Sequence, residues 1–257
     1  MIRRHFLASA AALLAAPVLR LSAQEAGGSL LEVARTTAAR PYVPNTTPLP
    51  PPFADLTYDA FRGIRPIAGK AAMLPVGPDY AVDLLPPGLY FPDPVMFELV
   101  GADGAIRTVP FSPASFTFEP RYFDDIPETA PGAGFTGLRL RHPLNAPDVM
   151  DEFMVMQGAS YFRAIGRAMG YGLSARAVAL GTGGSGPEEF PRFTRVRLHP
   201  PDAEGARIEA VIDGPSLAGY MDLHVVPGTD TVMRIDMTLL PRTEIADVGV
   251  APLTSMF

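Results

Sequence analysis

The C-terminal part of the chain alternates between apolar and polar residues with the period of a β-strand. Three segments, 207–213, 220–225 and 233–239, carry an apolar side chain at every second position. Successive side chains of a strand point to opposite faces, so each segment predicts a strand with one buried and one solvent-facing side. The residues predicted to be buried are Ile208, Ala210, Ile212, Met221, Leu223, Val225, Met233, Ile235, Met237 and Leu239.

Shorter strands, broken by proline and glycine, are predicted nearer the N-terminus. The pattern indicates strands over 80–85, 88–91, 94–100 and 105–111, with a hairpin turn at 102–104. The next segment is irregular, and its aromatic residues have two interpretations. They line a binding groove, as exposed aromatic patches do, or they pin a long loop to the core. These residues are Phe116, Phe118, Tyr122 and Phe123.

Helical patterns are confined to the N-terminal part. A helix predicted to begin after Ser29 has Glu32 at the spacing of a capping box, and Pro41 ends it. The proline-rich segment 41–52 is predicted to be extended, either as a plain connector or as a strap that holds the helix across the domain. A second short helix is predicted within 55–64. Because helices are few, the fold class predicted is all-β, a large antiparallel β-sandwich with a short N-terminal helix.

The segment 148–176 is the centre of the functional prediction. Its apolar runs at 153–156 and 164–165 are too short for helices, and glycines between and after them suit tight turns or close backbone approach. Four side chains lie close to these turns: Tyr161, Arg163, Tyr171 and Arg176. Aromatic rings cover the apolar faces of sugars, and guanidinium groups donate paired hydrogen bonds to hydroxyls. The pattern therefore predicts a carbohydrate-binding rim. The competing interpretation is structural: Tyr161 and Phe162 alternate, so only one faces out, and Arg176 pairs with Glu152.

Charge and composition exclude several functions. The chain has 21 basic and 27 acidic residues, and removal of residues 1–23 leaves a net charge of −9. An acidic body repels phosphate backbones, which argues against nucleic acid as a partner. The chain has no cysteine, so disulfides and zinc–thiolate sites are excluded. Its four histidines show no metal-binding spacing, and no metal or cofactor is predicted.

The first 23 residues have the pattern of a cleaved export signal. A charged start with Arg3 and Arg4 precedes an apolar run at 6–16 and a small-residue cleavage site at 21–23. The run is shorter than a membrane span, so the chain is predicted to be exported and its mature form to have no transmembrane segment. The paired arginines resemble the twin-arginine export pattern.

Hydrolysis of a glycosidic bond uses two carboxyl groups, so each acidic residue on a predicted strand or loop is a candidate. Adjacent acids on a strand point to opposite faces and cannot flank one bond. No pair stands out, and no catalytic residue is predicted. The candidates considered are Asp151, Glu152, Glu188, Glu189, Asp213, Asp222 and Asp236.

Several motifs occur in a fixed order along the chain. They are G-F-T-G-L-R at 134–139, H-P-L-N at 142–145, G-A-S-Y-F-R at 158–163, Y-G-L-S-A-R at 171–176, E-E-F-P-R-F at 188–193 and G-V-A-P-L-T-S-M-F at 249–257. Together they resemble the osmoregulated periplasmic glucan biosynthesis proteins of the G and D types. The resemblance covers roughly residues 30–257. It departs at Pro86-Pro87-Gly88, at Val196-Arg197 and at Gly219-Tyr220-Met221, where relatives carry a histidine or aromatic rings, so the resemblance does not fix the sugar register or the linkage preference.

The resemblance carries its own expectations. It implies a galactose-mutarotase-like sandwich over 53–257, preceded by the signal at 1–23 and the helix and linker at 24–52. It also implies a location in the periplasm of a Gram-negative bacterium. A β-glucan with a β-1,2-linked backbone is the implied ligand. The inner-membrane glucan synthesis machinery remains open as a second partner.

The resemblance leaves the activity undecided between two hypotheses. Relatives continue with an immunoglobulin-like domain, and the catalytic acids of D-type hydrolases fall beyond the segment that matches Phe257, so the chain is expected to be a truncated form with the groove alone. One hypothesis is a protein of periplasmic glucan biosynthesis that binds or processes the glucan chain. The alternative is a non-catalytic carbohydrate-binding or assembly module, or an inactive fragment of a β-1,2-glucanase-like protein.

Overall fold

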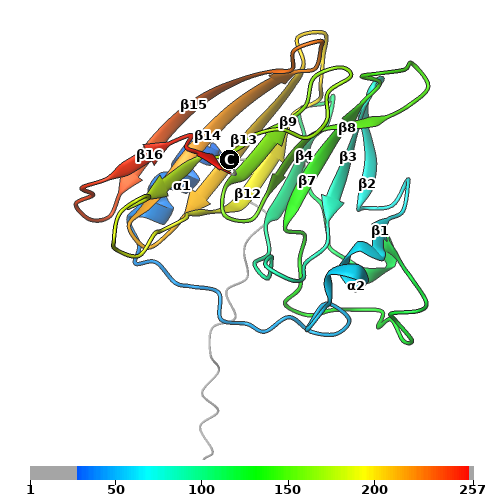
Figure 1. Ribbon diagram of the computed structural model, residues 1–257, viewed down its shortest axis with the longest axis horizontal. Coiled ribbons are helices and arrows are strands. Elements are labelled where there is room, and N and C mark those ends of the chain that lie inside the picture. The colour runs from blue at the N-terminus through cyan, green and yellow to red at the C-terminus, as the bar shows by residue number, and fades with distance from the viewer. Residues whose placement is uncertain (1–27, 255–257) are drawn as a thin grey trace, which may run out of the picture.

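Two large β-sheets form the protein (Figure 1). A computed structural model describes residues 28–254; the predicted export signal lies outside them. The seven-stranded sheet has the order β17-β10-β9-β8-β7-β3-β2. Its strands are β2 (Met73–Gly77), β3 (Tyr80–Leu85), β7 (Gly137–His142), β8 (Asp151–Gln157), β9 (Tyr161–Ala164), β10 (Ser174–Arg176) and β17 (Leu253–Thr254).

The six-stranded sheet has the order β15-β14-β13-β12-β4-β5. All of its pairs are antiparallel except β12 and β4, which run parallel and bring Arg195 opposite Met96. Its strands are β4 (Met96–Val100), β5 (Ile106–Thr108), β12 (Arg192–Leu198), β13 (Ala206–Asp213), β14 (Leu217–Val226) and β15 (Val232–Pro241). Two small sheets pair β1 (Ile64–Pro66) with β6 (Phe116–Phe118) and β11 (Val178–Leu180) with β16 (Val248–Val250).

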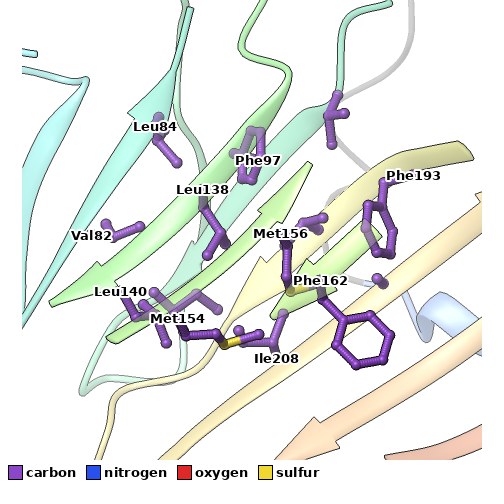
Figure 2. Packing of buried hydrophobic residues seen from close by; sticks show 14 of the residues in the cluster. Val82, Leu84, Phe97, Leu138, Leu140, Met154, Met156, Phe162, Phe193 and Ile208 are labelled. Atoms are coloured by element: carbon purple, nitrogen blue, oxygen red, sulfur yellow. The ribbon is translucent and has the colours of Figure 1, made fainter. Parts of the chain in front are cut away.

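The core lies between the inner faces of the two large sheets. Figure 2 shows Leu138 and Met156 of the seven-stranded sheet close to Phe193 and Ile208 of the six-stranded sheet. One continuous cluster of buried apolar side chains includes residues from both, so the predicted all-β sandwich is confirmed. The predicted alternation is also confirmed for β13 and β14, whose apolar rows are fully buried. The row on β15 is only half-buried, because β15 is at the edge of its sheet.

The N-terminal segment crosses the outside of the sandwich. Helix α1 (Leu30–Ala38) packs on the outer face of β13 and β14, where Leu30 and Ala34 contact Val211 (Figure 1). The predicted capping box is wrong: Ser29 makes no side-chain cap, and Glu32 pairs instead with Arg35 at 2.9 Å. Residues 41–50 have no regular structure and lead to Phe53, which is buried in the main core.

Short local elements follow the sequence pattern closely. Helix α2 (Tyr58–Arg62) lies within the segment predicted to be helical, and Thr57 caps it by accepting a hydrogen bond from the backbone of Ala60. A 3-10 turn, η2 (Pro113–Ser115), precedes β6. The hairpin at 102–104 is confirmed, with Gly104 at a φ of 75°. The aromatic residues Phe116 and Phe118 pack in or against the core, so the loop-pinning interpretation holds for them rather than the groove.

Candidate functional site

The candidate site lies on the outer face of the seven-stranded sheet. In its register, Arg139 faces Val155, which faces Arg163, and Gln157 faces Tyr161, which faces Arg176. Residues directly opposite each other in an antiparallel pair point to the same side of a sheet. The alternate residues of these strands lie in the core. The predicted alternation of Tyr161 and Phe162 is confirmed, because Phe162 is buried and Tyr161 faces out.

A cavity of about 520 Å³ occupies this face. Three of the four predicted rim residues, Tyr161, Arg163 and Arg176, line it. Tyr171 lies beside it, with its ring centre 3.9 Å from the Arg163 guanidinium carbon. The strand β9 begins at Tyr161, several residues before the apolar run that predicted it, so Tyr161 and Arg163 belong to the strand rather than to the turn. The sequence pattern thus identified side chains that the fold brings together.

Glu152 joins these side chains into one polar cluster. Its Oε2 is 3.1 Å from Nε of Arg139, and its Oε1 accepts a hydrogen bond from the Tyr171 hydroxyl at 3.2 Å. Arg163 lies 3.9 Å from the same carboxylate. Burial, and then the negative charge of Glu152, raises the pKa of Tyr171, so this hydroxyl stays protonated and able to donate. The cluster fixes two arginines at the cavity by contacts to one carboxylate.

Arg176 does not contact Glu152, the partner considered in the sequence analysis. Its Nη1 donates to the carbonyl of Ala159 at 2.6 Å, and its guanidinium carbon lies 4.4 Å from the centre of the Phe190 ring. The hypothesis that Arg176 pairs with Glu152 is therefore wrong. Burial lowers the pKa of Arg176, but a guanidinium keeps its charge at any physiological pH.

The rim of the cavity contains aromatic residues that sequence analysis missed. The segment predicted as a strand over 88–91 is a tight turn, with a positive φ of 138° at Gly88, and it presents Tyr90 with 91% of its surface exposed. Phe91 packs on Gly158, where a Cβ would lie 2.9 Å from the ring and φ is 58°. Both Tyr90 and Phe91 line the cavity. The proline and glycine at the start of this segment are the sequence signal that would have predicted a turn instead of a strand.

Most carboxylates considered as candidates have structural partners away from the cavity. Asp213 lies 2.8 Å from Arg242, and Glu189 accepts hydrogen bonds from Ser216. Of the seven acids, Glu152 is the one that lines the cavity. The candidates are therefore spread over both sheets rather than gathered at one place.

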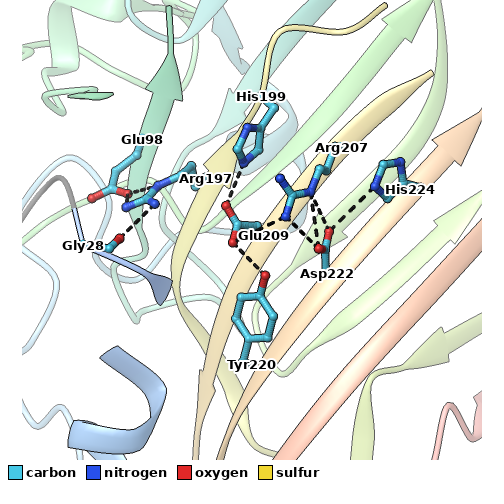
Figure 3. Close-up of polar contacts among 9 residues, drawn as sticks. All are labelled: Gly28, Glu98, Arg197, His199, Arg207, Glu209, Tyr220, Asp222 and His224. Carbon is cyan, nitrogen blue, oxygen red and sulfur yellow. Dashed lines mark hydrogen bonds and ion pairs between the residues drawn. The ribbon is translucent and has the colours of Figure 1, made fainter. Parts of the chain in front are cut away.

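A second polar cluster lies on the outer face of the six-stranded sheet (Figure 3). Glu209 is 2.7 Å from His199 and accepts a hydrogen bond from the Tyr220 hydroxyl at 2.7 Å. The hydrogen bond with His199, followed by that with Tyr220, lowers the pKa of Glu209 to about 2. Arg207 forms a paired contact with Asp222, at 2.8 Å and 3.0 Å. Since these groups satisfy one another, the cluster is a structural network.

Residues 28–254 show neither a group of three or more metal-ligating side chains nor a helix long and apolar enough to cross a bilayer. The site is thus described by its cavity, its arginines and its aromatic rim. These features define a class: an all-β sandwich with a polar groove on the outer face of one sheet.

Comparison with known proteins identifies the family. Residues 27–257 match the family described as "Periplasmic glucan biosynthesis protein, MdoG", and the chain belongs to this family. It is 38% identical over 238 residues to glucans biosynthesis protein G 1 of Shewanella oneidensis, covering 90% of this chain and 42% of that protein. It is 37% identical over 231 residues to glucans biosynthesis protein G of Vibrio cholerae, covering 89% of this chain and 42% of that protein. The chain thus spans about two fifths of the length of these relatives.

Proposed function

We propose that this protein takes part in periplasmic glucan biosynthesis and that its groove binds the β-glucan chain. The observation that carries the proposal is the convergence of Tyr161, Arg163 and Arg176 on one cavity beside the exposed ring of Tyr90. Aromatic rings cover the apolar faces of a sugar, and arginines donate to its hydroxyls. Membership of the family supports the same ligand class.

The proposal is for binding. Glycoside hydrolysis uses two carboxyl groups placed on either side of the bond. Both oxygens of Glu152 are already engaged, one by Arg139 and one by Tyr171. These contacts hold the arginines in position for a ligand. Binding of a glucan chain requires no rearrangement of Glu152.

A titration with linear β-1,2-glucan oligosaccharides tests the assignment. Tyr161 lines the cavity while its neighbour Phe162 is in the core, so Tyr161→Ala removes a ring from the groove and leaves the packing in place. We expect the affinity to fall by about three- to tenfold, the value of one aromatic contact. The melting temperature of the variant controls for folding, and Tyr42→Ala, a half-buried tyrosine that lines neither this cavity nor the one beside it, is the control. Equal affinity in wild type and Tyr161→Ala would refute the proposal.

We also propose export to the periplasm through the twin-arginine route, which rests on Arg3 and Arg4 and on the apolar run that follows them. Replacing both arginines with lysine keeps the charge and removes the pair. We expect the variant to accumulate inside the cell in a fractionation experiment. Undiminished periplasmic protein from the double variant would instead assign export to the general secretory route.

A further inference from the structure

A second cavity, of about 420 Å³, adjoins the first on the same face. It lies where α2 and β1 meet the outer face of β3 and β7, and it shares Leu85, Arg139 and Gln157 with the first cavity. The two cavities therefore form one continuous groove across the sheet. A chain-like ligand bound in the first cavity has room to continue into the second.

Four arginines line this second cavity: Arg62, Arg65, Arg139 and Arg141. Arg139 pairs with Glu152, and Arg141 pairs with Asp83 at 2.6 Å. Within residues 28–254, no carboxylate lies within 4.0 Å of Arg62 or Arg65. Two acids thus offset four bases, and the cavity keeps an excess of positive charge in a chain that is acidic as a whole.

The most deeply held of these arginines is Arg141. Asp83 beneath it is fully buried, and its Oδ2 accepts a hydrogen bond from Nε of Arg141 at 2.8 Å. Nη1 of Arg141 donates to the carbonyl of Met150 at 3.1 Å. The contact with Asp83 raises the pKa of Arg141, which keeps its charge fixed in place. A guanidinium held in this way loses little side-chain entropy when a ligand arrives.

The polar side chains that line this cavity are mostly hydrogen-bond donors, since four of the five are arginines. An arginine has five N–H donors and no acceptor. The remaining polar side chain of this cavity is Gln157, whose amide nitrogen already donates to Thr136 at 3.0 Å. A neutral sugar hydroxyl both donates and accepts, whereas an oxyanion only accepts. The donor-rich, positively charged lining therefore fits an oxyanion better than a neutral hydroxyl.

We infer that the second cavity is an anion subsite, which takes a phosphate or carboxylate group carried by the saccharide chain bound in the first cavity. This inference rests on the proposed function and narrows its ligand to an acidic glucan. Arg62 and Arg65 supply the charge that is free to pair with the ligand, and Arg139 and Arg141 form the fixed floor.

Calorimetric titration of the full chain separates the two cavities. The probes are neutral β-1,2-glucan oligosaccharides, the same oligosaccharides with primary hydroxyls oxidised to carboxylates, and inorganic phosphate alone. We expect the oxidised oligosaccharides to bind about tenfold more tightly, as charge-assisted hydrogen bonds provide. We expect the double variant Arg62→Gln/Arg65→Gln to remove most of that advantage and to lower the affinity for the neutral oligosaccharides much less. Both arginines are exposed, so folding is retained, which the melting temperature checks. Arg234→Gln, on β15 with 81% of its side chain exposed, is the matched control.

The outcomes distinguish this inference from the function on which it rests. Equal affinity for neutral and oxidised oligosaccharides overturns the anion subsite and leaves glucan binding standing. If the double variant still binds the oxidised oligosaccharides more tightly than the neutral ones, the anion subsite does not lie at Arg62 and Arg65. If no neutral oligosaccharide binds, the proposed function fails, and phosphate binding that depends on Arg62 and Arg65 still supports the subsite. Inorganic phosphate that displaces the oxidised but not the neutral oligosaccharide supports it as well.

Discussion

Charged residues on both sheets form hydrogen bonds and ion pairs with one another. Replacing one of them is therefore expected to change the free energy of unfolding. Glu209 shows this most clearly, because its carboxylate receives hydrogen bonds from both His199 and Tyr220. Its folded-state pKa of about 2 lies below the ordinary value of 4.5. A lowered carboxyl pKa contributes stability above the ordinary pKa, and this contribution is lost as the pH falls toward the folded value.

The pH dependence of unfolding checks this effect. We expect Glu209→Gln to lower the free energy of unfolding at neutral pH by up to about 3 kcal/mol, as the pKa shift sets an upper limit. The gap between wild type and variant shrinks below pH 4.5 and closes near pH 2. Urea denaturation at a series of pH values measures it, with the exposed Asp236→Asn as control. A gap that is independent of pH would contradict the role of this carboxylate.

Sequence alone predicted which side chains face the groove better than it predicted their partners. Alternation is a local property, so it predicted that only one of Tyr161 and Phe162 faces out, and in the structure Tyr161 does while Phe162 is buried. The partner of Arg176 is the carbonyl of Ala159, and no side-chain pattern reports on a backbone acceptor. Tyr90 was missed because the apolar residues around it predicted a strand. In the structure the segment is a turn with a positive φ at Gly88, and this turn exposes the ring.

At the scale of elements, α1 is held by a small apolar cluster separate from the main core. Leu30 is fully buried against Val211, on the outer face of the six-stranded sheet. Arg242 adds hydrogen bonds to the carbonyls of Thr37 and Arg40, at 2.7 Å and 2.9 Å. The helix thus packs on the outside of the six-stranded sheet and contributes no side chain to the main core.

Leu30→Ala tests this separation. A buried Leu→Ala change costs about 2–5 kcal/mol, and here we expect the loss to fall on the docking of α1. Hydrogen exchange of amides 30–38 is expected to accelerate while the amides of β13 and β14 remain protected. Thr36→Ala, on the exposed side of the same helix, is the matched control. Equal protection of α1 in the two variants would contradict a local role for Leu30.

Antiparallel neighbours were predictable, but the pairing of β4 with β12 was not. The hairpin between β4 and β5 follows from a turn of three residues. The parallel contact joins residues about a hundred positions apart, such as Phe97 and Val196. Neither strand's own sequence identifies its neighbour, because which strand lies beside which depends on the path of the whole chain.

For the whole molecule, the decisive feature is the main core that the two large sheets share. Side chains from both large sheets belong to one cluster, so neither sheet keeps its buried face if the other unfolds. Leu138 on β7 and Ile208 on β13 represent the two sides (Figure 2).

We therefore expect Leu138→Ala and Ile208→Ala each to lower the stability by about 2–5 kcal/mol and to shift one shared transition. Far-UV circular dichroism and tyrosine fluorescence are the two probes, since the chain contains no tryptophan. The two unfolding curves should coincide in wild type and in both variants. Separate transitions, each moved by one variant alone, would show two independent units instead.

The docking of α1 also sets an order for assembly. The surface that receives Leu30 is built by β13, β14 and β15, so the helix contacts residues roughly two hundred positions further along the chain. A chain that folds as it emerges from the ribosome holds α1 without its partner until the β13–β15 meander is complete. The docking of α1 therefore follows the pairing of these three strands. Its hydrogen bonds with Arg242 are expected to form late in folding, although α1 is the first helix of the described chain.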